Sequence, residues 1–533
     1  MASQHEYAQH RTGSFLSLAN LKKDFPASIV VFLVALPLCL GIALASGAPL
    51  FAGILTGIIG GTVVASVSGS QLSVSGPAAG LTVIVASSIA KLHGYEAFLL
   101  AVVLAGVMQI LLGMLKAGTI ASYFPSAVIE GMLAGIGIIL IRKQIQHAVG
   151  YDADYEGNET FSWNDFSAIT SMFNAVSLGA VIISILSLLI LIYWPKVKKV
   201  ASVPAPLIVV VLGIALNMVF KGSGLEIQSE HIVKIPVVNS ANEFMSLFRL
   251  PDFSKIMVSD VWIVAGTIAI VASLETLLSI EAVDKIDPYK RVSPTNRELV
   301  AQGAGNIVSG MLGGLPMTAV IVRSSANVNS GGKTKLSAVL HGSWLLLSLL
   351  LIPGVLNSIP LSCLAAILLM TGYKLAKIEL FKKMWNEGKE QFIPFVVTVL
   401  AVVFTDLLKG VGIGMMIGVF YILRNNMRNP YFYHIERVGN KKLIKINLAE
   451  EVSFLNKAAI QYTLNHLPSG VDVVIDGTNS RYIDSDVLEI IHNFKHNAYS
   501  RGIIVQFVNI KHKYDVPQLK DLILKPEKVE THA

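Results

Sequence analysis

Apolar residues occur in long runs between Ala27 and Leu423, and short polar segments separate the runs. Each run has about 14–22 residues, close to the length with which a helix crosses the hydrocarbon core of a bilayer. The stretch from Ala27 to Ala90 contains no Asp, Glu, Lys or Arg. The pattern predicts a polytopic α-helical membrane protein with fourteen spans, at 27–46, 50–67, 77–91, 97–116, 122–141, 175–194, 201–220, 261–281, 295–311, 316–329, 335–352, 355–373, 392–404 and 410–423.

The pattern changes after residue 428, where charged residues become frequent and apolar runs become short. Buried strands are expected at 443–448, 471–476 and 503–508, alternating with amphipathic helices at 454–467 and 484–499. This β-α-β-α-β order predicts a small α/β domain. The sequence therefore divides into a cytoplasmic N-terminal arm at 1–24, a transmembrane transport domain at 25–428 and a cytoplasmic α/β domain at 429–533.

The composition supports membrane insertion and excludes several classes of protein. Hydrophobic residues make up 53% of the 533 residues and charged residues 14%, against roughly 25% charged in typical soluble proteins. Such a chain is not a soluble enzyme. Cys39 and Cys363 lie far apart in apolar runs, which favours buried free thiols over a disulfide framework.

The positions of the basic residues predict the topology. Lys and Arg gather in the connections that follow even-numbered spans, while Arg142 and Lys143 are the main exceptions. Because cytoplasmic loops are enriched in Lys and Arg, both termini are expected in the cytoplasm, with the chain in the cytoplasmic membrane. The net charge of +7 then reflects topology, and it does not indicate a nucleic-acid partner.

Each half of the predicted transport domain has one apolar span interrupted by Gly and Pro, at 69–80 and 313–320. Pro77 and Pro316 belong to the third span of their respective halves and are expected in the first turn of a short helix. Two such N-termini near the membrane midplane would direct unpaired N–H groups and positive dipole ends at one point, which suits a small anion. The alternative is that the Gly-Pro pairs only kink packed helices.

Charged residues inside spans are costly and usually functional. Arg323 is expected about two turns into the helix opened by Pro316, beside the anion pocket, although a structural ion pair is the alternative. Glu275 lies mid-span with Ser279 one turn later. Glu275 has three open roles: it carries a coupling proton, binds a cation, or pairs with Arg323. H⁺ or Na⁺ as coupling ion is the only cofactor expected, because no nucleophile triad, metal-ligand cluster or GxxxxGK[ST] motif occurs.

Three segments carry a resemblance to a known family: 34–38 (Val-Ala-Leu-Pro-Leu), 74–80 (Val-Ser-Gly-Pro-Ala-Ala-Gly), and 306–329 with its Arg323-Ser324 pair. In this order they resemble the sulfate permease (SulP) family of anion transporters, and the C-terminal region resembles the STAS domain of that family. The resemblance implies seven-plus-seven inverted repeats arranged as core and gate domains, and a homodimer. It also implies transport of sulfate, bicarbonate, chloride or dicarboxylates.

The resemblance also implies where the anion binds. Family members hold it between the third and tenth spans, which here corresponds to the substrate-binding residues Gly76, Pro77, Ala78, Ala79, Val320, Ile321 and Arg323. Many members carry hydroxyl side chains where this chain has Ala78 and Val322, so backbone N–H groups are left as the main donors. Sodium-coupled bicarbonate members have Asp with a hydroxyl residue one turn later, and proton-coupled members usually have Glu. Glu275 with Ser279 combines the two patterns, and 32–47 and 69–81 look closer to bicarbonate members.

In related STAS domains an Asp-Ser pair before a helix carries a phosphorylated Ser, which makes Ser485 a candidate regulatory phosphosite. The alternative is that Asp484-Ser485 only caps the helix. Three functions follow from the sequence: a secondary active anion transporter that works by alternating access, an uncoupled anion channel or exchanger in which Glu275 is structural, and a membrane sensor that signals to a protein partner through the STAS domain.

Overall fold

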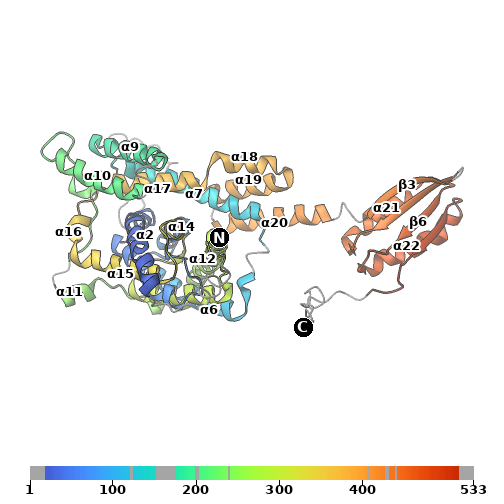
Figure 1. Ribbon diagram of the computed structural model, residues 1–533, viewed down its shortest axis with the longest axis horizontal. Coiled ribbons are helices and arrows are strands. Elements are labelled where there is room, and N and C mark those ends of the chain that lie inside the picture. The colour runs from blue at the N-terminus through green and yellow to red at the C-terminus, as the bar shows by residue number, and fades with distance from the viewer. Residues whose placement is uncertain are drawn as a thin grey trace. The chain divides into compact units, whose positions relative to one another are not determined.

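The computed structural model describes residues 18–119, 124–151, 176–197, 203–237, 240–405, 407–426, 431–438 and 441–514. The chain divides into two compact units, Met1–Met415 and Met416–Ala533 (Figure 1). Most of the predicted N-terminal arm and the end of the predicted C-terminal domain lie outside the described residues.

The first unit is helical, and each of the fourteen predicted spans contains a helix. The first seven are α2 (Leu18–Ala45), α3 (Leu50–Ile59) with its continuation through a π-turn into α4 (Ala65–Val67), α5 (Thr82–Leu92), α6 (Tyr95–Met114), α7 (Ser126–Ala148), α9 (Leu178–Tyr193) and α10 (Ala205–Phe220). The second seven are α12 (Ser259–Ile286), α13 (Thr295–Leu312), α14 (Ile321–Asn329), α15 (Leu336–Leu351), α17 (Leu361–Leu375), α19 (Lys389–Phe404) and α20 (Leu407–Asn426).

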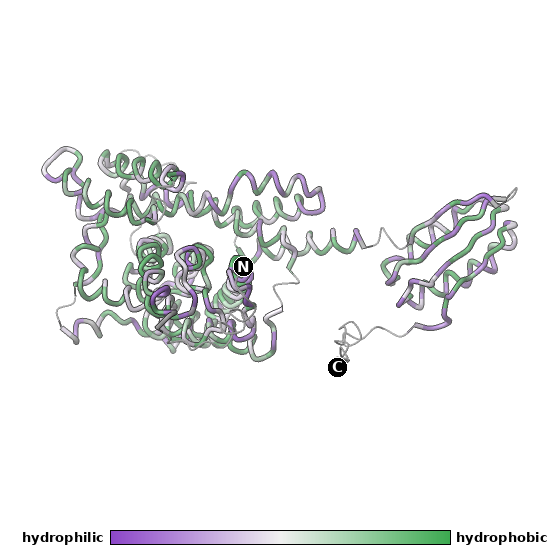
Figure 2. Tube along the Cα trace, viewed as in Figure 1, coloured by the Kyte–Doolittle hydropathy of each residue, from purple (hydrophilic) through white to green (hydrophobic). Residues whose placement is uncertain are grey.

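Several of these helices have the length and composition of membrane spans. Among the described residues, seven helical stretches are long and apolar enough to cross a bilayer, and α5, α10 and α15 belong to shorter apolar helices. Figure 2 shows apolar residues along most of this unit, with polar segments mainly at helix ends and connections. Short helices lie in the connections: α11 (Ala241–Ser246), α16 (Pro353–Leu356) and α18 (Ile378–Asn386).

Helix α2 begins within the segment that was predicted as a polar arm, and Asp24 joins it to the rest of the unit. The helix begins at Leu18, earlier than the predicted arm allows. Asp24 is fully buried and accepts hydrogen bonds from the N–H groups of Lys333 and Thr334 and from the Thr334 hydroxyl, at 2.6, 3.1 and 2.5 Å. Since these two residues follow α14, the carboxylate ties α2 to the end of that helix. In the first unit α14 packs against both α2 and α12 (Figure 1).

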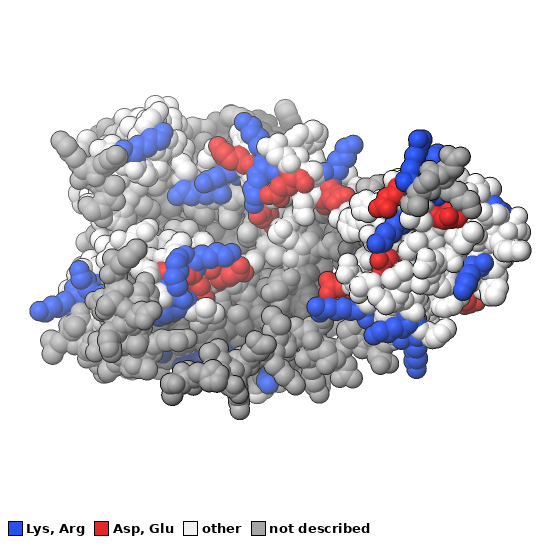
Figure 3. All heavy atoms as spheres, turned by 45° about the vertical axis from the view of Figure 1, so that its right-hand side comes forward, with Lys and Arg blue, Asp and Glu red and all other residues white. Residues whose placement is uncertain are grey.

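Charged side chains lie mainly at the surface, and several of them form ion pairs. On the face shown in Figure 3, basic and acidic side chains gather next to one another and leave uncharged surface between the groups. Lys383 pairs with Glu130 at 3.2 Å, and Lys285 pairs with Glu281 at 2.7 Å. The half-buried Glu130, near the start of its helix, therefore has a structural partner.

The second unit begins within α20 and continues as a small α/β domain. Its sheet has the order β3-β4-β6-β8, formed by Tyr431–Val438, Lys441–Leu448, Asp472–Asp476 and Ile504–Val508. The pairs β4–β6 and β6–β8 are parallel, whereas β3 pairs antiparallel with β4. Two longer helices accompany the sheet, α21 (Lys457–Asn465) and α22 (Ser485–Tyr499), and a short pair joins β5 (Glu451–Val452) to β7 (Tyr482–Ile483).

The predicted β-α-β-α-β order is confirmed, and its apolar strands form the core of the domain with the inner faces of the helices. The sequence did not predict β3. Six consecutive side chains of this edge strand, at 432–437, are exposed. It therefore lacks the buried apolar run from which the other strands were predicted.

Candidate anion-binding site

Two short strands from distant parts of the chain pair with each other in the interior of the first unit. β1 (Ser75–Pro77) pairs antiparallel with β2 (Met317–Ala319), and Gly76 lies opposite Thr318. All six residues are buried. The pairing satisfies backbone groups of extended segments that cannot be left bare at membrane depth, and it brings the segments that lead into α5 and α14 to one place.

Each strand leads directly into a short helix. Ala78 is extended, with φ −113° and ψ 137°, and precedes the 3-10 turn Ala79–Leu81 that continues into α5. Val320 is extended, with φ −118° and ψ 115°, and precedes α14. The prediction that Pro77 and Pro316 occupy first helical turns was therefore wrong. Pro77 ends β1, and Pro316 lies before β2.

The register of the strands explains why a proline is tolerated there. Pro77 lies opposite Met317, and Gly76, one residue before it, is opposite Thr318. In an antiparallel pair only alternate residues exchange hydrogen bonds with the partner, so a proline fits where its missing N–H is not needed. The chain therefore continues as a strand up to Pro77, and the helix begins afterwards.

The helix starts supply donors to the site. The first N–H groups of a helix have no intrahelical acceptor, and here they belong to Ala79 and Gly80 on one side and to Ile321 and Val322 on the other. Ala78 is 1% exposed, whereas Ile321 and Val322 are 43% and 45% exposed. The start of α14 therefore combines backbone donors with accessible apolar side chains. This chemistry can hold a small anion through main-chain N–H groups.

Arg323 is the third residue of α14, and its side chain is fully buried. Its Nη2 donates to the carbonyl oxygen of Pro77 at 3.3 Å. Nη1 lies so close to Gly76 that a Cβ there would be 2.0 Å from it. The guanidinium therefore packs against β1, one turn nearer the helix start than predicted.

The positive charge of Arg323 has no acidic partner within the part of the chain that the structure describes. Its Nε and Nη1 make no hydrogen bond there, and the nearby groups that interact with it are the buried Cys39 thiol and His341 imidazole. A buried cation without a counter-charge is expensive. The arrangement therefore creates a positive potential that an anion beside β1 would offset.

Glu275 approaches the site from α12. The residue is partly exposed, and a Cβ at Gly80 would be 2.7 Å from its Oε2 and 2.9 Å from its Oε1. Its carboxylate therefore lies against the first residues of the α5 half-helix. Glu275 and Arg323, both described, form no ion pair within 4.0 Å, which contradicts the third of the roles considered for Glu275. Ser279, one turn later, is 8% exposed.

Uncharged polar side chains that were not predicted as site residues hold the paired strands in place. Ser324 Oγ accepts the Val74 N–H at 2.9 Å, and Asn327 Nδ2 donates to the Leu72 carbonyl at 3.1 Å. Thr56 Oγ1 accepts the Leu315 N–H at 2.7 Å. The signal available in the sequence was the presence of uncharged polar residues inside otherwise apolar spans.

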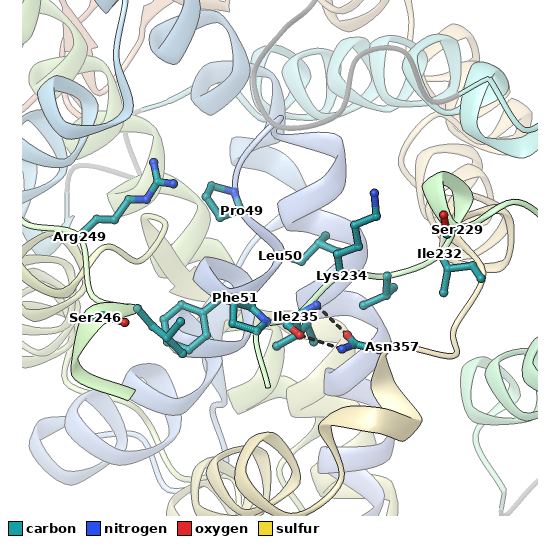
Figure 4. A pocket seen from close by; sticks show the side chains of 13 residues that line it. Pro49, Leu50, Phe51, Ser229, Ile232, Lys234, Ile235, Ser246, Arg249 and Asn357 are labelled. Carbon is teal, nitrogen blue, oxygen red and sulfur yellow. Dashed lines mark hydrogen bonds between the residues drawn. The ribbon is translucent and has the colours of Figure 1, made fainter. Parts of the chain in front are cut away.

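The structure also has a large surface cavity away from these residues. It has a volume of about 650 Å³ and is lined in part by Lys234, Arg249 and Phe51 (Figure 4). Asn357 pairs with both the N–H and the C=O of Ile235 at 2.7 and 2.8 Å, the two dashed contacts in the figure. No predicted site residue lines this cavity. Substitution of a basic side chain in this cavity can therefore serve as the control for substitutions at the site beside β1 and β2.

Comparison with known proteins identifies the family. The model of the sulfate permease family matches residues 21–398. The chain belongs to the sulfate permease family. It is thus a membrane anion transporter and not an enzyme, and its C-terminal unit fits the STAS domain expected from the resemblance.

Individual relatives agree with this family assignment. YvdB of Bacillus subtilis, designated a candidate sulfate transporter, is 29% identical over 409 residues, covering 76% of this chain and 74% of YvdB. The bicarbonate transporter BicA of Synechocystis is 29% identical over 406 residues, covering 75% of this chain and 69% of BicA.

Solved structures agree with the fold. The transmembrane domain of a cyanobacterial bicarbonate transporter BicA matches with a TM-score of 0.63 at 25% identity, covering 74% of this chain and 99% of that domain. The murine Solute Carrier 26 family member A9 anion transporter in the inward-facing state matches with a TM-score of 0.73 at 14% identity, covering 96% of this chain and 90% of that one. The predicted helical transporter fold with a small α/β domain is confirmed.

The contact between Glu275 and Gly80 gives a first test of the site. A methyl group at Gly80 would be placed 2.7 Å from the Glu275 carboxylate, below van der Waals separation. The added methyl group would push the end of the flexible Glu275 side chain away from the start of α5. We therefore expect Gly80→Ala to reduce anion uptake in proteoliposomes about tenfold, the effect of about 1.4 kcal/mol. Gly266→Ala is the matched control, because Gly266 lies on the same helix as Glu275 and a Cβ there meets no atom within 4 Å. Equal uptake by the two variants would contradict the placement of Glu275.

Proposed function

We propose that this protein is a secondary active transporter of a small inorganic anion of the sulfate or bicarbonate class, coupled to H⁺ or Na⁺. The observation that carries the proposal is the antiparallel pairing of β1 and β2. The pairing brings together the starts of two helices, whose first N–H groups have no intrahelical acceptor. Beside them lies the buried guanidinium of Arg323, which has no acidic partner in the part of the chain that the structure describes. Helix N-termini and a buried cation together favour a small anion.

Within this proposal Gly76, Pro77, Ala78 and Ala79 form one side of the anion site, and Val320 and Ile321 form the other. Their side chains offer no hydroxyl or amide donor, so selectivity depends on the backbone N–H groups and on the size of the space. Relatives named as bicarbonate transporters and as sulfate transporters support this substrate class. The apolar side chains around the donors favour an anion with little remaining hydration.

The coupling ion acts at Glu275 in this proposal. The carboxylate lies against Gly80 at the start of one half-helix, so its negative charge competes with the anion for the same positive dipole end. Protonation of Glu275, or binding of Na⁺ to Glu275 with Ser279 as an additional ligand, removes the repulsion between this carboxylate and the anion. The anion is then bound more tightly. In alternating access, the core domain with its bound anion and coupling ion then moves against the gate domain. Both termini remain in the cytoplasm.

A gradient experiment tests the proposal. Purified protein in proteoliposomes is given labelled sulfate or labelled bicarbonate, with an imposed inward H⁺ gradient, an inward Na⁺ gradient, or neither. We expect at least one anion to accumulate above its external concentration with one of the two gradients, because coupling supplies the free energy for uphill movement. Movement of the anion only down its own gradient would instead support the uncoupled channel or exchanger.

The STAS domain is proposed to have a regulatory or assembly role. The Asp484 side chain accepts the Asp486 N–H at 3.0 Å, so it caps α22, and Ser485 at the first helical position is exposed. Asp484 therefore caps the helix, which does not exclude modification of its neighbour. Phosphorylation of Ser485 stays a prediction that mass spectrometry of the purified protein can test. A homodimer and a protein partner of this domain are likewise proposals.

A further inference from the structure

Two side chains hold the edge of β2 that faces away from β1. Asn306 on α13 accepts the Met317 N–H with Oδ1 at 2.8 Å, and its Nδ2 lies 3.3 Å from the Met317 carbonyl oxygen. The amide thus contacts both backbone groups of Met317, as a neighbouring strand would. Thr276 Oγ1 on α12 accepts the Ala319 N–H at 3.2 Å. Both side chains are fully buried.

The strand register shows why β2 needs these partners. Thr318 lies opposite Gly76, and the Val320 N–H donates to the Val74 carbonyl at 2.9 Å. Because bonded positions alternate in an antiparallel pair, the N–H groups of Met317 and Ala319 point away from β1. Side chains from α13 and α12 therefore supply the acceptors that a third strand would provide.

The same contacts connect β2 to the helix that carries Glu275. Asn306 Nδ2 donates to Gln109 Oε1 at 2.7 Å, and Gln109 Nε2 lies 3.3 Å from Ser273 Oγ. Ser273 and Thr276 flank Glu275 on α12. Ala319, which Thr276 binds, is next to Val320, the residue before α14. Two hydrogen-bonded routes therefore join the surroundings of Glu275 to the start of the α14 half-helix.

We propose that Thr276 and Asn306 are positioning residues for transport. They set the position of β2, and through β2 the N–H groups at the start of α14, relative to Glu275. The proposal rests on the proposed anion site, since it concerns the geometry of that site. Loss of the Thr276 hydroxyl leaves the Ala319 N–H without its acceptor, so α14 no longer holds its donors at a fixed distance from the α5 start. The anion is then bound more weakly, and its binding responds less to the state of Glu275.

The test compares Thr276→Val with Thr276→Ser in proteoliposomes. The two variants differ in whether a hydroxyl acceptor remains, and valine has nearly the shape of threonine. Uptake of labelled sulfate and of labelled bicarbonate is measured. Each rate is divided by the amount of transporter that is monodisperse after purification. We expect Thr276→Val to raise KM about tenfold and to weaken the dependence of KM on the coupling-ion concentration. Thr276→Ser should stay within about threefold of the unmodified protein.

A purely structural role predicts a different result, namely less monodisperse protein with an unchanged KM. That result, or a KM for Thr276→Val equal to that of Thr276→Ser, overturns the inference. If Thr276→Val is not monodisperse, Asn306→Asp is measured instead, because it keeps an acceptor for Met317 but loses both amide donors. The same rise in KM is expected, and an unchanged KM overturns the inference. If the unmodified protein transports neither anion, the proposed function fails rather than the positioning role.

Discussion

Glu275→Gln should abolish gradient-driven accumulation of the anion. The substitution keeps the size of the side chain and removes its charge. The residue is partly exposed and lies against Gly80 at one of the two helix starts. With a neutral side chain no proton or sodium ion is gained and released in each cycle. In proteoliposomes with an imposed H⁺ or Na⁺ gradient, the internal anion should rise only to its passive equilibrium level.

Exchange of labelled for unlabelled anion should survive in Glu275→Gln, because the anion donors remain. This second measurement separates loss of coupling from loss of folding. Glu281→Gln is the matched control, since Glu281 lies on the same helix but is exposed and pairs with Lys285 at 2.7 Å. It should accumulate the anion normally. Undiminished uphill uptake by Glu275→Gln would exclude Glu275 as the coupling residue.

Arg323→Gln should raise the KM for the anion at least about tenfold. Its guanidinium is fully buried against β1, and its Nε and Nη1 have no partner among the described residues. An anion roughly 5–10 Å away, one to two strand spacings, would gain about 2–3 kcal/mol from this charge at an effective dielectric constant of 20. The initial rate of uptake as a function of anion concentration measures the effect.

The control for Arg323 is Arg249→Gln. Arg249 is half-exposed, lines the 650 Å³ surface cavity and lies 3.6 Å from Glu96. Exposed ion pairs contribute little, and this cavity contains none of the proposed site residues. We expect KM to stay within about twofold of the unmodified value. A larger effect of Arg249→Gln than of Arg323→Gln would place the anion site at the surface cavity.

The errors in placing Pro77, Pro316 and Arg323 come from one cause. Pro77 and Pro316 were expected at helix starts because proline favours the first turn. They lie instead in and before strands, since β1 and β2 pair across more than two hundred residues. Local patterns cannot reveal this pairing, because each strand is only three residues long. The position of Arg323, on the third residue of its helix and behind β1, follows from the same pairing.

The sequence by itself determined the membrane class, the fourteen helical segments, the α/β domain and the pair of interrupted spans. These follow from hydrophobic periodicity and from the cost of charge in a bilayer, both of which act locally along the chain. Only the tertiary structure decided which backbone groups are satisfied by which partners. It placed Glu275 against Gly80, buried Arg323 without an acidic partner among the described residues, and placed Thr276 and Asn306 in hydrogen-bonding contact with β2. These contacts join residues far apart in the chain, and burial at membrane depth requires them because every backbone polar group there must find a partner within the protein.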